Sequence, residues 1–465
     1  MTLFISTRGD KEKLNFEDVM LKGLAADGGL YVPEVWPTFT KDEWRSLVGK
    51  PYVDVAEFVI APFVGDTIPK AELKAMIVEA YASFSHKAVT PLTQLDNNQW
   101  LLELYHGPTI AFKDVAMQLI AKLMDRALTN RGQRSTIVCA TSGDTGGAAV
   151  EAFMACERID LFVLHPDERV SPVQRRQMTT SASSNVYNIA IKGNFDDCQN
   201  QVKAMFNDNA FRGEVALSGV NSINWARIMA QVVYYVTSSL ALGGPDKICD
   251  YTVPTGNFGD IFAAYVAHKM GLPMGKRIVA TNENDILKRA LATGHYDMNK
   301  VVATTSPSMD IQISSNFERL LFEASGRDSD QINQMMNSLK QSGQFEIDSK
   351  TLSVINQQFE AGTADENAVA QTMKSSLSDS GKLIDPHTAV ALSVAQQHLG
   401  DNPMVILSTA NPAKFPDAVK AATGIHPELP SHLSDLFDRA EKYDILDNDA
   451  TQIMQYIKTN SRAIR

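Results

Sequence analysis

The chain repeats one pattern: a short run of apolar residues, a turn that contains glycine or serine, and then a helix. The clearest apolar runs are at residues 136–140, 161–164, 248–253 and 404–407. Strands that are apolar throughout are buried on both faces, and their alternation with helices is typical of a parallel sheet that helices cover on both sides. We therefore predict an α/β fold built on open, twisted sheets.

The domain organisation follows from where this alternation begins and stops. With 465 residues, the chain is long enough for two or three domains. We predict two α/β domains, at residues 99–240 and 241–425, and a polar insertion with exposed helices at 327–382 in the second. Residues 1–98, with many Gly and Pro turns, are predicted to form an extra N-terminal domain, and residues 426–465 a C-terminal helical tail.

Composition excludes several classes of partner. The net charge of −11 and the pI of about 5.4 argue against nucleic-acid binding, which needs a basic face. No apolar stretch is long enough for a membrane span or a signal peptide, so we expect a cytoplasmic protein. No His/Cys spacing predicts a metal site, and no C-x-x-C pair occurs among the four cysteines, Cys139, Cys156, Cys198 and Cys249.

Lys113 stands where a loop turns into an amphipathic helix whose apolar stripe begins at Val115. The N-terminal end of a helix carries partial positive charge, which disfavours a second cation and makes the amine easier to deprotonate. Such an amine can form a Schiff base with an aldehyde cofactor. Taken alone, however, a lysine at such a position is more often an ordinary solvated side chain.

Two glycine-containing turns follow strands and open helices, at the place where open α/β sheets bind ligands. In the first, residues 140–149, glycines let backbone N–H groups face an anion, and Ser142 and Thr145 add hydroxyl donors. This turn lacks the G-x-G-x-x-G spacing and the Walker lysine, so a dinucleotide or NTP site is disfavoured. The second, residues 256–259, can hold a phosphate by backbone N–H groups alone. An ordinary capped turn is the alternative for each.

The last apolar run ends at Ser408 and Thr409. A hydroxyl at a strand end can bond a ring nitrogen, and unlike a carboxylate it does not force that nitrogen to stay protonated. One aldehyde-reactive amine, two anion-binding turns and a neutral partner for a ring nitrogen together match pyridoxal phosphate, which has an aldehyde, a phosphate and a pyridine ring. One anion-binding turn is then free for a substrate carboxylate.

These motifs resemble the threonine synthase family of pyridoxal-phosphate enzymes, whose fold (type II) is related to the tryptophan synthase β chain. The resemblance covers nearly the whole chain. Its motifs are at residues 6–9, 27–30, 106–109, 111–114, 142–146, 221–227 and 256–259.

The resemblance implies conversion of O-phospho-L-homoserine and water to L-threonine and phosphate, with pyridoxal 5′-phosphate held on Lys113. It also implies that the Lys113 amine moves the α proton and the β proton of the substrate. The residues that we expect to bind the cofactor are Phe112, Lys113, Gly256, Asn257, Phe258, Gly259, Asp260, Ser408 and Thr409. The residues that we expect to bind the substrate are Thr141, Ser142, Gly143, Asp144, Thr145, Asn224, Arg227 and Lys414.

Some roles stay open at this point. Many relatives in the wider class carry asparagine at the position of Asp144, so this residue either contacts the cofactor hydroxyl or orients neighbouring donors. For the leaving phosphate, Arg227 is the first candidate, with Asn224 on the same helix face at i, i+3 spacing. Lys414 and Arg175 are weaker candidates, and a surface or salt-bridged role is the alternative for all three cations. We expect His106 to position the loop before Lys113.

Two other functions fit the same motifs less well. One is a dehydratase or phospho-lyase of the same cofactor class, which would release a 2-oxo acid. The other is a non-catalytic, ligand-binding paralogue, against which the intact Lys113 and both glycine turns argue. The sequence does not choose between a monomer and a dimer.

Overall fold

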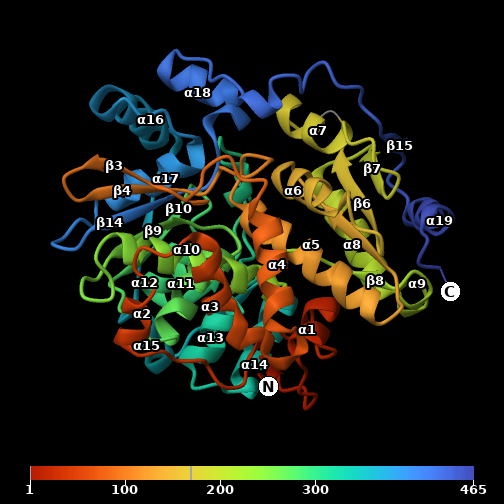
Figure 1. The fold of residues 1–465 in the computed structure, drawn as a ribbon, viewed down its shortest axis with the longest axis horizontal. Helices are drawn as coiled ribbons and strands as arrows, with labels where there is room; N and C mark the ends of the chain where they lie inside the picture. Colours follow the sequence, from red (N-terminus) through yellow and green to blue (C-terminus); the bar gives the residue numbers. More distant parts are fainter. Residues whose placement is uncertain (1, 168–169, 465) are drawn as a thin grey trace.

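The computed structural model describes residues 2–167 and 170–464, which form two main β-sheets with helices around and between them (Figure 1). Within the described residues, the larger sheet has six strands, of which only the edge strand β3 is antiparallel. Their spatial order is β13 (Phe359–Thr363), β10 (Arg277–Thr281), β9 (Asp250–Pro254), β14 (Met404–Ser408), β4 (Gln99–Glu103) and β3 (Leu92–Asp96).

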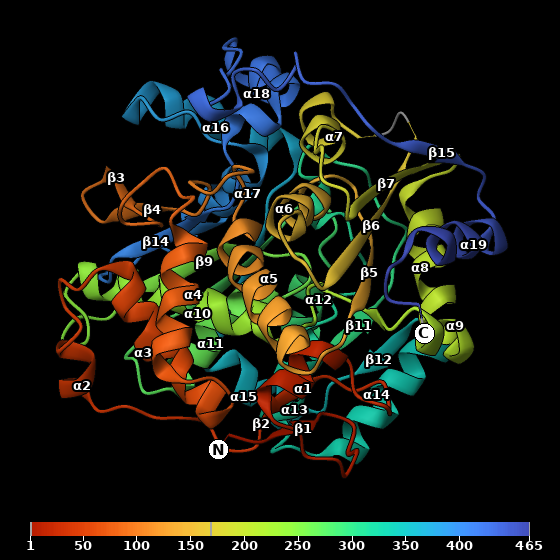
Figure 2. The ribbon, with the colours of Figure 1, turned by 45° about the vertical axis from the view of Figure 1, so that its right-hand side comes forward.

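The smaller sheet is entirely parallel within the described part of the chain (Figure 2). Its spatial order is β15 (Asp444–Leu446), β7 (Val186–Ile191), β6 (Ile159–Pro166), β5 (Ser135–Ala140) and β8 (Leu217–Ser218). The predicted α/β class with two open sheets is confirmed, because apolar strands such as β5 and β6 are buried along almost their whole length.

Two helices lie between the sheets and lead into the predicted site (Figures 1 and 2). α5 (Lys113–Asn130) follows β4, and α6 (Asp144–Phe153) follows β5. On the larger sheet, α10 (Trp225–Ala241), α11 (Gly259–Lys269) and α17 (Pro386–Ala395) surround the central strands. The other α-helices of the two sheet regions are α7 (Pro172–Thr179), α8 (Phe195–Asn207), α9 (Asn209–Glu214), α12 (Ile286–Thr293), α13 (Phe317–Ala324), α14 (Ser329–Ser342), α15 (Ser349–Asn356), α16 (Glu366–Ser380), α18 (Pro416–Thr423) and α19 (Ala450–Asn460).

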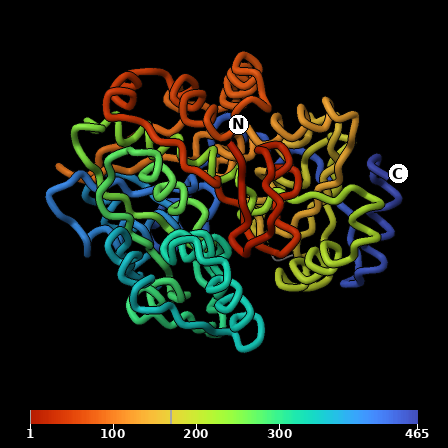
Figure 3. Tube along the Cα trace, turned by 90° about the horizontal axis from the view of Figure 1, so that it is seen from below, coloured from red at the N-terminus to blue at the C-terminus, as the bar shows by residue number. Residues whose placement is uncertain are grey.

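The N-terminal region attaches to this framework through an aromatic cluster. The rings of Phe4 and Phe63 both lie 5.6 Å from the ring of Trp225 at the start of α10, and Trp225 is fully buried. Figure 3 shows this region, in red, running beside the segment that contains α13 and α14. Its elements are β1 (Phe4–Ser6), α1 (Phe16–Lys22), β2 (Tyr31–Pro33), α2 (Lys41–Arg45), α3 (Tyr52–Val64) and α4 (Lys70–Tyr81).

The predicted domain boundaries do not coincide with the sheets. The boundary at 98/99 separates β3 from β4, although the two strands pair with each other in the larger sheet. The prediction placed β4 in one domain with β5. In the structure β4 belongs to the larger sheet, where it pairs in parallel with β14, for example at Leu101 and Ile406. The chain crosses between sheets through α5, and a block-wise division along the sequence misses this crossing.

Two further segments contain strands that were predicted as helical. The stretch 327–382 supplies β13, which pairs in parallel with β10, and β12 (Gln344–Glu346), which pairs with β11 (His295–Asp297). The tail 426–465 supplies β15 at the edge of the smaller sheet. Edge strands are only half-buried, so they lack the continuous apolar run that identified the central strands.

Within residues 2–167 and 170–464, no helix combines the length and the apolar content needed to cross a bilayer. The same residues contain no group of three or more His, Cys, Asp or Glu side chains that could hold a metal ion.

Candidate active site

Three chain segments meet at the carboxylate of Asp144. Lys113 is the first residue of α5, Asp144 is the first residue of α6, and Lys414 ends the short helix η3 (Pro412–Lys414) after β14. The Lys113 Nζ lies 3.2 Å from Asp144 Oδ2, and the Lys414 Nζ lies 3.1 Å from Asp144 Oδ1. The side chains of Lys113, Asp144 and Lys414 are 9%, 5% and 0% exposed, so two buried ammonium groups share one buried carboxylate.

The electrostatics of this cluster favour a reactive amine. Burial lowers the pKa of Lys113, Asp144 opposes that shift, and the cations Arg227 and Lys414 add to it. The sequence predicted the direction but attributed it to the helix N-terminus, whereas burial is the largest cause here. Burial alone would raise the pKa of Asp144, but Lys414, Lys113 and a hydrogen bond from Gln174 hold it well below its ordinary value. Asp144 is therefore ionised at neutral pH.

The turn before α6 is tightly packed around this carboxylate. The Thr141 hydroxyl accepts hydrogen bonds from the backbone N–H groups of Gly143 and Gly146, at 2.9 and 3.0 Å. Gly143 has a φ of 144°, and a Cβ there would come within 2.4 Å of the Gln174 side chain. Gln174 Nε2 donates to Asp144 Oδ1 at 2.8 Å, so only glycine leaves room for this contact.

Two hydroxyls of the same turn are available to a ligand. Ser142 and Thr145 are half-buried, and neither side chain has a hydrogen-bond partner within the described residues. Both stay predicted substrate contacts.

The second glycine turn joins β9 to α11 and contains no cation. Phe258 is buried, adopts a left-handed φ of 62° and forms the N-cap of α11. Gly256 lies against the backbone of Ser308, where a Cβ would come within 2.7 Å of the carbonyl oxygen. Gly256, Asn257 and Gly259 are half-buried, so the loop backbone is packed on one side and open on the other.

Asp260, predicted as a cofactor contact, turns its Oδ1 toward two tyrosines. The Tyr235 hydroxyl donates to Asp260 Oδ1 at 2.7 Å, and the Tyr234 hydroxyl donates to the same oxygen. Its Oδ2 is buried without a hydrogen-bond partner among the described residues. Burial raises the pKa of Asp260 to about 6, while the two tyrosine hydrogen bonds act in the opposite direction. The observed contacts support the shape of the loop, and a direct contact with the cofactor stays a prediction.

The structure distinguishes the two hydroxyls predicted for the ring nitrogen. Thr388 donates its hydroxyl hydrogen to the buried carboxylate of Asp385, which can only accept. Ser408 Oγ, 3.0 Å from Thr388 Oγ1, must therefore donate to Thr388. The Thr409 hydroxyl has no partner within the described part of the chain, and its carbonyl accepts from the Phe112 N–H at 2.8 Å. Thr409 is thus the freer of the two hydroxyls.

The three cations predicted for the substrate phosphate have different partners in the structure. Arg227 is 5% exposed, donates one hydrogen bond to the Val220 carbonyl at 3.3 Å, and forms no ion pair within the described residues. Arg175, by contrast, is paired with Glu441 at 2.9 and 3.0 Å. Lys414 is committed to Asp144 and also donates to the Thr109 carbonyl and to Gln177.

Asn224 has a different environment from the one predicted. Its side chain accepts from the Ala226 N–H as the N-cap of α10 and donates to the carbonyls of Met20 and Gly219. These bonds use its oxygen and both amide hydrogens, which argues for a structural role beside Arg227 rather than substrate contact.

Several polar residues near the site carried no sequence signal. The Ser308 hydroxyl lies 3.5 Å from Asp144 Oδ2, and the Ser308 N–H donates to His387 Nε2 at 3.3 Å. His387 Nδ1 is 2.8 Å from Asp385 Oδ2. Predicted His106 contacts Glu103 at 2.7 Å and so holds the loop before Lys113. The nearest signal was the Ser171-Pro172 start of α7, which locates the helix that carries Gln174 but not the partner of its side chain.

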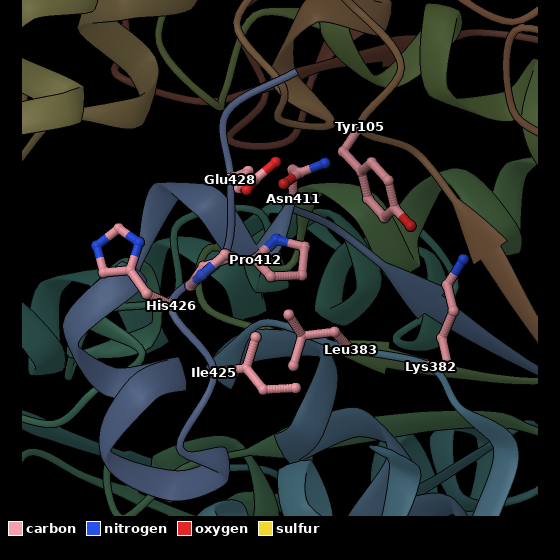
Figure 4. A pocket seen from close by; sticks show the side chains of 9 residues that line it. Tyr105, Lys382, Leu383, Asn411, Pro412, Ile425, His426 and Glu428 are labelled. Atoms are coloured by element: carbon pink, nitrogen blue, oxygen red, sulfur yellow. The ribbon is translucent and has the colours of Figure 1, made fainter. Parts of the chain in front are cut away.

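An outward pocket of about 460 Å³ lies beside the segments that carry Lys113 and Thr409. Tyr105 and Lys382 line it on one side, and Ile425 and His426 on the other (Figure 4). Asn411 and Pro412 contribute the wall that continues toward Thr409. Neither Lys113 nor Asp144 nor Lys414 is among the residues that line this pocket.

Comparison with known proteins gives the class to which this site belongs. Residues 84–336 match the family described as "Pyridoxal-phosphate dependent enzyme". The chain is accordingly an enzyme that depends on pyridoxal phosphate, as the motifs predicted.

The flanking regions are more specific. Residues 3–81 match "Threonine synthase N terminus", and residues 388–457 match "Threonine synthase, C-terminal". A threonine synthase from Pseudomonas aeruginosa is 49% identical over 457 residues, covering 98% of this chain and 97% of that protein. The chain therefore belongs to the threonine synthase family.

Solved structures agree with this assignment. A structure of PLP-bound threonine synthase from Brucella melitensis has a TM-score of 0.98 and 57% sequence identity, with both chains fully covered. Threonine synthase from yeast has a TM-score of 0.93 and 36% identity, with 98% of each chain covered.

The residues present fit pyridoxal phosphate. The cofactor needs an amine for its aldehyde, donors for its phosphate and a partner for its ring nitrogen. Lys113 offers a buried amine with a lowered pKa. The loop at Gly256 leaves a space that a Cβ would obstruct, and Thr409 offers an unpaired hydroxyl just after β14.

Proposed function

We propose that the enzyme converts O-phospho-L-homoserine and water to L-threonine and phosphate. The observation that carries the substrate assignment is Arg227, a buried guanidinium without a carboxylate partner among the described residues. An uncompensated buried cation is costly, and a phosphorylated substrate would supply the missing anion. The match to the threonine synthase family along the chain supports the same reaction.

The residues that would hold the cofactor lie in the segments that follow three strands of the larger sheet, β4, β9 and β14. Lys113 would hold its aldehyde, the backbone N–H groups of residues 257–259 its phosphate, and Thr409 its ring nitrogen. When bound, the cofactor supplies an aldehyde for the substrate amine and a ring that takes up negative charge from the broken bonds. Phe112, next to the Lys113 amine, would line the same space.

Lys113 would also serve as the base. Because its pKa is lowered, a larger fraction of the amine is neutral and can accept a proton from a substrate carbon. Asp144 holds the amine at 3.2 Å and stays ionised, so it orients Lys113 without competing for the proton. One mobile amine can then take the α proton and move the β proton in turn.

The substrate would lie between the turn at α6 and Arg227. The hydroxyls of Ser142 and Thr145 and the first N–H groups of α6 suit a carboxylate. Arg227 suits the phosphate, and Lys414, which is paired with Asp144, adds positive charge nearby. Even with Lys113 neutral, the two cations Lys414 and Arg227 outnumber the one carboxylate, Asp144, which favours an anionic substrate.

We further propose a cytoplasmic location. All four cysteines are free and buried, in keeping with a reducing compartment. A monomer and a dimer both remain compatible with these observations.

The decisive experiment incubates the purified holoenzyme with O-phospho-L-homoserine and assays phosphate, threonine and 2-oxobutyrate together. We expect threonine and phosphate in equal amounts. Phosphate accompanied by 2-oxobutyrate would indicate the dehydratase or phospho-lyase instead. No turnover by a protein that nevertheless binds the cofactor would indicate a non-catalytic paralogue.

A further inference from the structure

The carbonyl groups of the glycine loop at α11 are held from behind. The Ser314 hydroxyl donates to the Gly256 carbonyl at 2.6 Å. The Asn316 N–H and Nδ2 both donate to the Asn257 carbonyl, at 3.0 and 2.9 Å. In a planar trans peptide the C=O and the following N–H point in opposite directions. Fixing these two carbonyls therefore turns the N–H groups of Asn257 and Phe258 to the opposite side of the loop.

Asn316 departs from what its position predicts. It is the N-cap of α13, where an asparagine usually accepts a hydrogen bond from its own helix. Here the side chain forms no such cap. Its Nδ2 donates instead to the carbonyls of Asn257 and Ser222, 2.9 and 3.1 Å away, and the residue is fully buried. The side chain is thus used to join two loops.

Arg319, one turn further along α13, fixes Asn316 in place. Its Nη1 donates to Asn316 Oδ1, which leaves the Asn316 amide hydrogens facing the loops. Its Nε donates to the Tyr31 carbonyl at 2.9 Å and its Nη2 to the Ile223 carbonyl at 2.7 Å. The guanidinium is fully buried and lies 5.8 Å from the centre of the Trp225 ring. It joins the N-terminal region, the loop before α10 and the glycine loop.

Arg319 also brings charge to the back of the loop. Its hydrogen-bond acceptors are two backbone carbonyls and an amide oxygen, all neutral, and neighbouring Glu318 is paired with Arg8 at 2.8 Å. Burial lowers the pKa of Arg319 to about 9, so the group remains a cation at neutral pH. An anion on the open side of the loop would partly offset the cost of burying this charge.

We propose that Ser314, Asn316 and Arg319 are positioning residues that aim the N–H groups of the glycine loop at the cofactor phosphate. None of the three contacts the phosphate in this scheme, and each acts through the loop backbone. The inference rests on the proposed assignment of residues 257–259 to that phosphate.

The test compares two ligands on the apoenzyme. Pyridoxal 5′-phosphate and pyridoxal share the aldehyde and the ring, but only the first has a phosphate. Dissociation constants are measured by absorbance for the parent and for Ser314→Ala, Asn316→Ala and Ser315→Ala. Ser315 is a matched control, because its hydroxyl lies 3.5 Å from the Asn257 side chain and not against a loop carbonyl.

We expect Ser314→Ala, which loses one hydrogen bond to the loop, to weaken binding of the phosphorylated ligand about 5-fold. Asn316→Ala loses its side-chain bonds to Asn257, Ser222 and Arg319, and we expect about 30-fold weaker binding. Pyridoxal affinity should change by less than about 2-fold in all variants, and Ser315→Ala should resemble the parent. Equal weakening of both ligands, or no change in either with Ser314→Ala, would overturn the proposal. Should Asn316→Ala fail to fold, the comparison of Ser314→Ala with Ser315→Ala still decides the question.

One more variant separates this inference from the site assignment on which it rests. Gly256→Ala places a Cβ against the Ser308 carbonyl and disturbs the loop directly. If it weakens the phosphorylated ligand selectively while Ser314→Ala does not, the loop binds phosphate without help from behind. If Gly256→Ala weakens binding of both ligands equally, the assignment of this loop to the cofactor phosphate is itself wrong.

Discussion

The turn that opens α6 and the turn that opens α11 have similar sequences and opposite chemistry. At α6, a carboxylate occupies the first helical position, and two lysines and a glutamine converge on it. At α11, the contacts are neutral: hydroxyl and amide groups hold backbone carbonyls from behind. Glycines identify both as turns where a backbone can approach a ligand, but only the surrounding side chains decide what each turn offers.

This difference suits two different tasks. A cofactor phosphate stays bound through turnover, so a rigid cradle of N–H groups with no mobile side chain is adequate. The amine at α6 must gain and lose protons, and charges nearby tune it. The comparison predicts that variants at α6 change chemistry and pH dependence, whereas variants at α11 change cofactor affinity.

The largest effect is expected for Lys113→Ala. Loss of the only proposed base should lower threonine formation by about 10⁴-fold. Borohydride reduction of the holoenzyme followed by peptide mapping should find the cofactor on Lys113 and nowhere else. The matched control is Lys122→Ala on the same helix, a half-buried lysine paired with Glu79, which should retain parent activity. Full turnover by Lys113→Ala would refute its proposed roles in holding the cofactor and in moving the substrate protons.

Much of the framework behind this prediction is visible in the sequence. β5 and β14 coincide with the apolar runs predicted at 136–140 and 404–407 and extend each by one residue, because apolar runs are local signals. β13 was missed because an edge strand has mixed polarity. Family motifs located Lys113 and both turns.

The contacts that differentiate the two turns have no such local signal. Gln174, Asn316 and Arg319 reach their partners from segments 30 to 288 residues away in the chain. The contacts that argue against a substrate role for Asn224 are also distant in the sequence. Helical spacing places it beside Arg227, but only the fold shows that its amide is already bonded to Met20.

Asp144→Asn should have the next largest effect, because it leaves two buried ammonium groups without a carboxylate. Breaking a buried ion pair typically costs about 3 kcal/mol, and we expect a loss of that size in the unfolding free energy of the apoenzyme. Asp144 also raises the pKa of Lys113, so its removal should lower that pKa further. The pH dependence of Lys113 acylation in the apoenzyme measures the second effect, and an upward shift would contradict the proposed electrostatics.

Arg227→Met should act on the substrate and shift the lysine in the opposite direction. Loss of a charge-assisted contact with the substrate phosphate should raise KM by about 30-fold with little change in cofactor affinity. Because Arg227 lowers the pKa of Lys113, the same variant should raise it. Arg175→Met removes a cation that is already paired with Glu441 and serves as the control. Equal KM effects in both variants would remove Arg227 from the site.

The smallest effect probes the α11 turn through Asp260. Its pKa is raised to about 6, so between the unfolded value of about 4 and this value the native state holds a proton that the unfolded chain has released. The stability contributed by that proton is fully present below the unfolded pKa and is lost as pH rises through about 6. Asp260→Asn keeps an acceptor for Tyr234 and Tyr235 and avoids burying the charge. The variant apoenzyme should match the parent near pH 3 and exceed it by about 2 to 3 kcal/mol near pH 7.5.

Thermal or urea unfolding across that pH range measures the difference. Asp348, the N-cap of α15, provides a control of opposite sign, because hydrogen bonds from Thr351 lower its pKa to about 2. Asp348→Asn should therefore lose stability relative to the parent as pH rises through the unfolded value, where Asp260→Asn gains it. A variant at Asp260 that is less stable than the parent at neutral pH would mean that this carboxylate is paired with a cation. In that case the α11 turn would be a charged site like the turn at α6, and the contrast between them would fail.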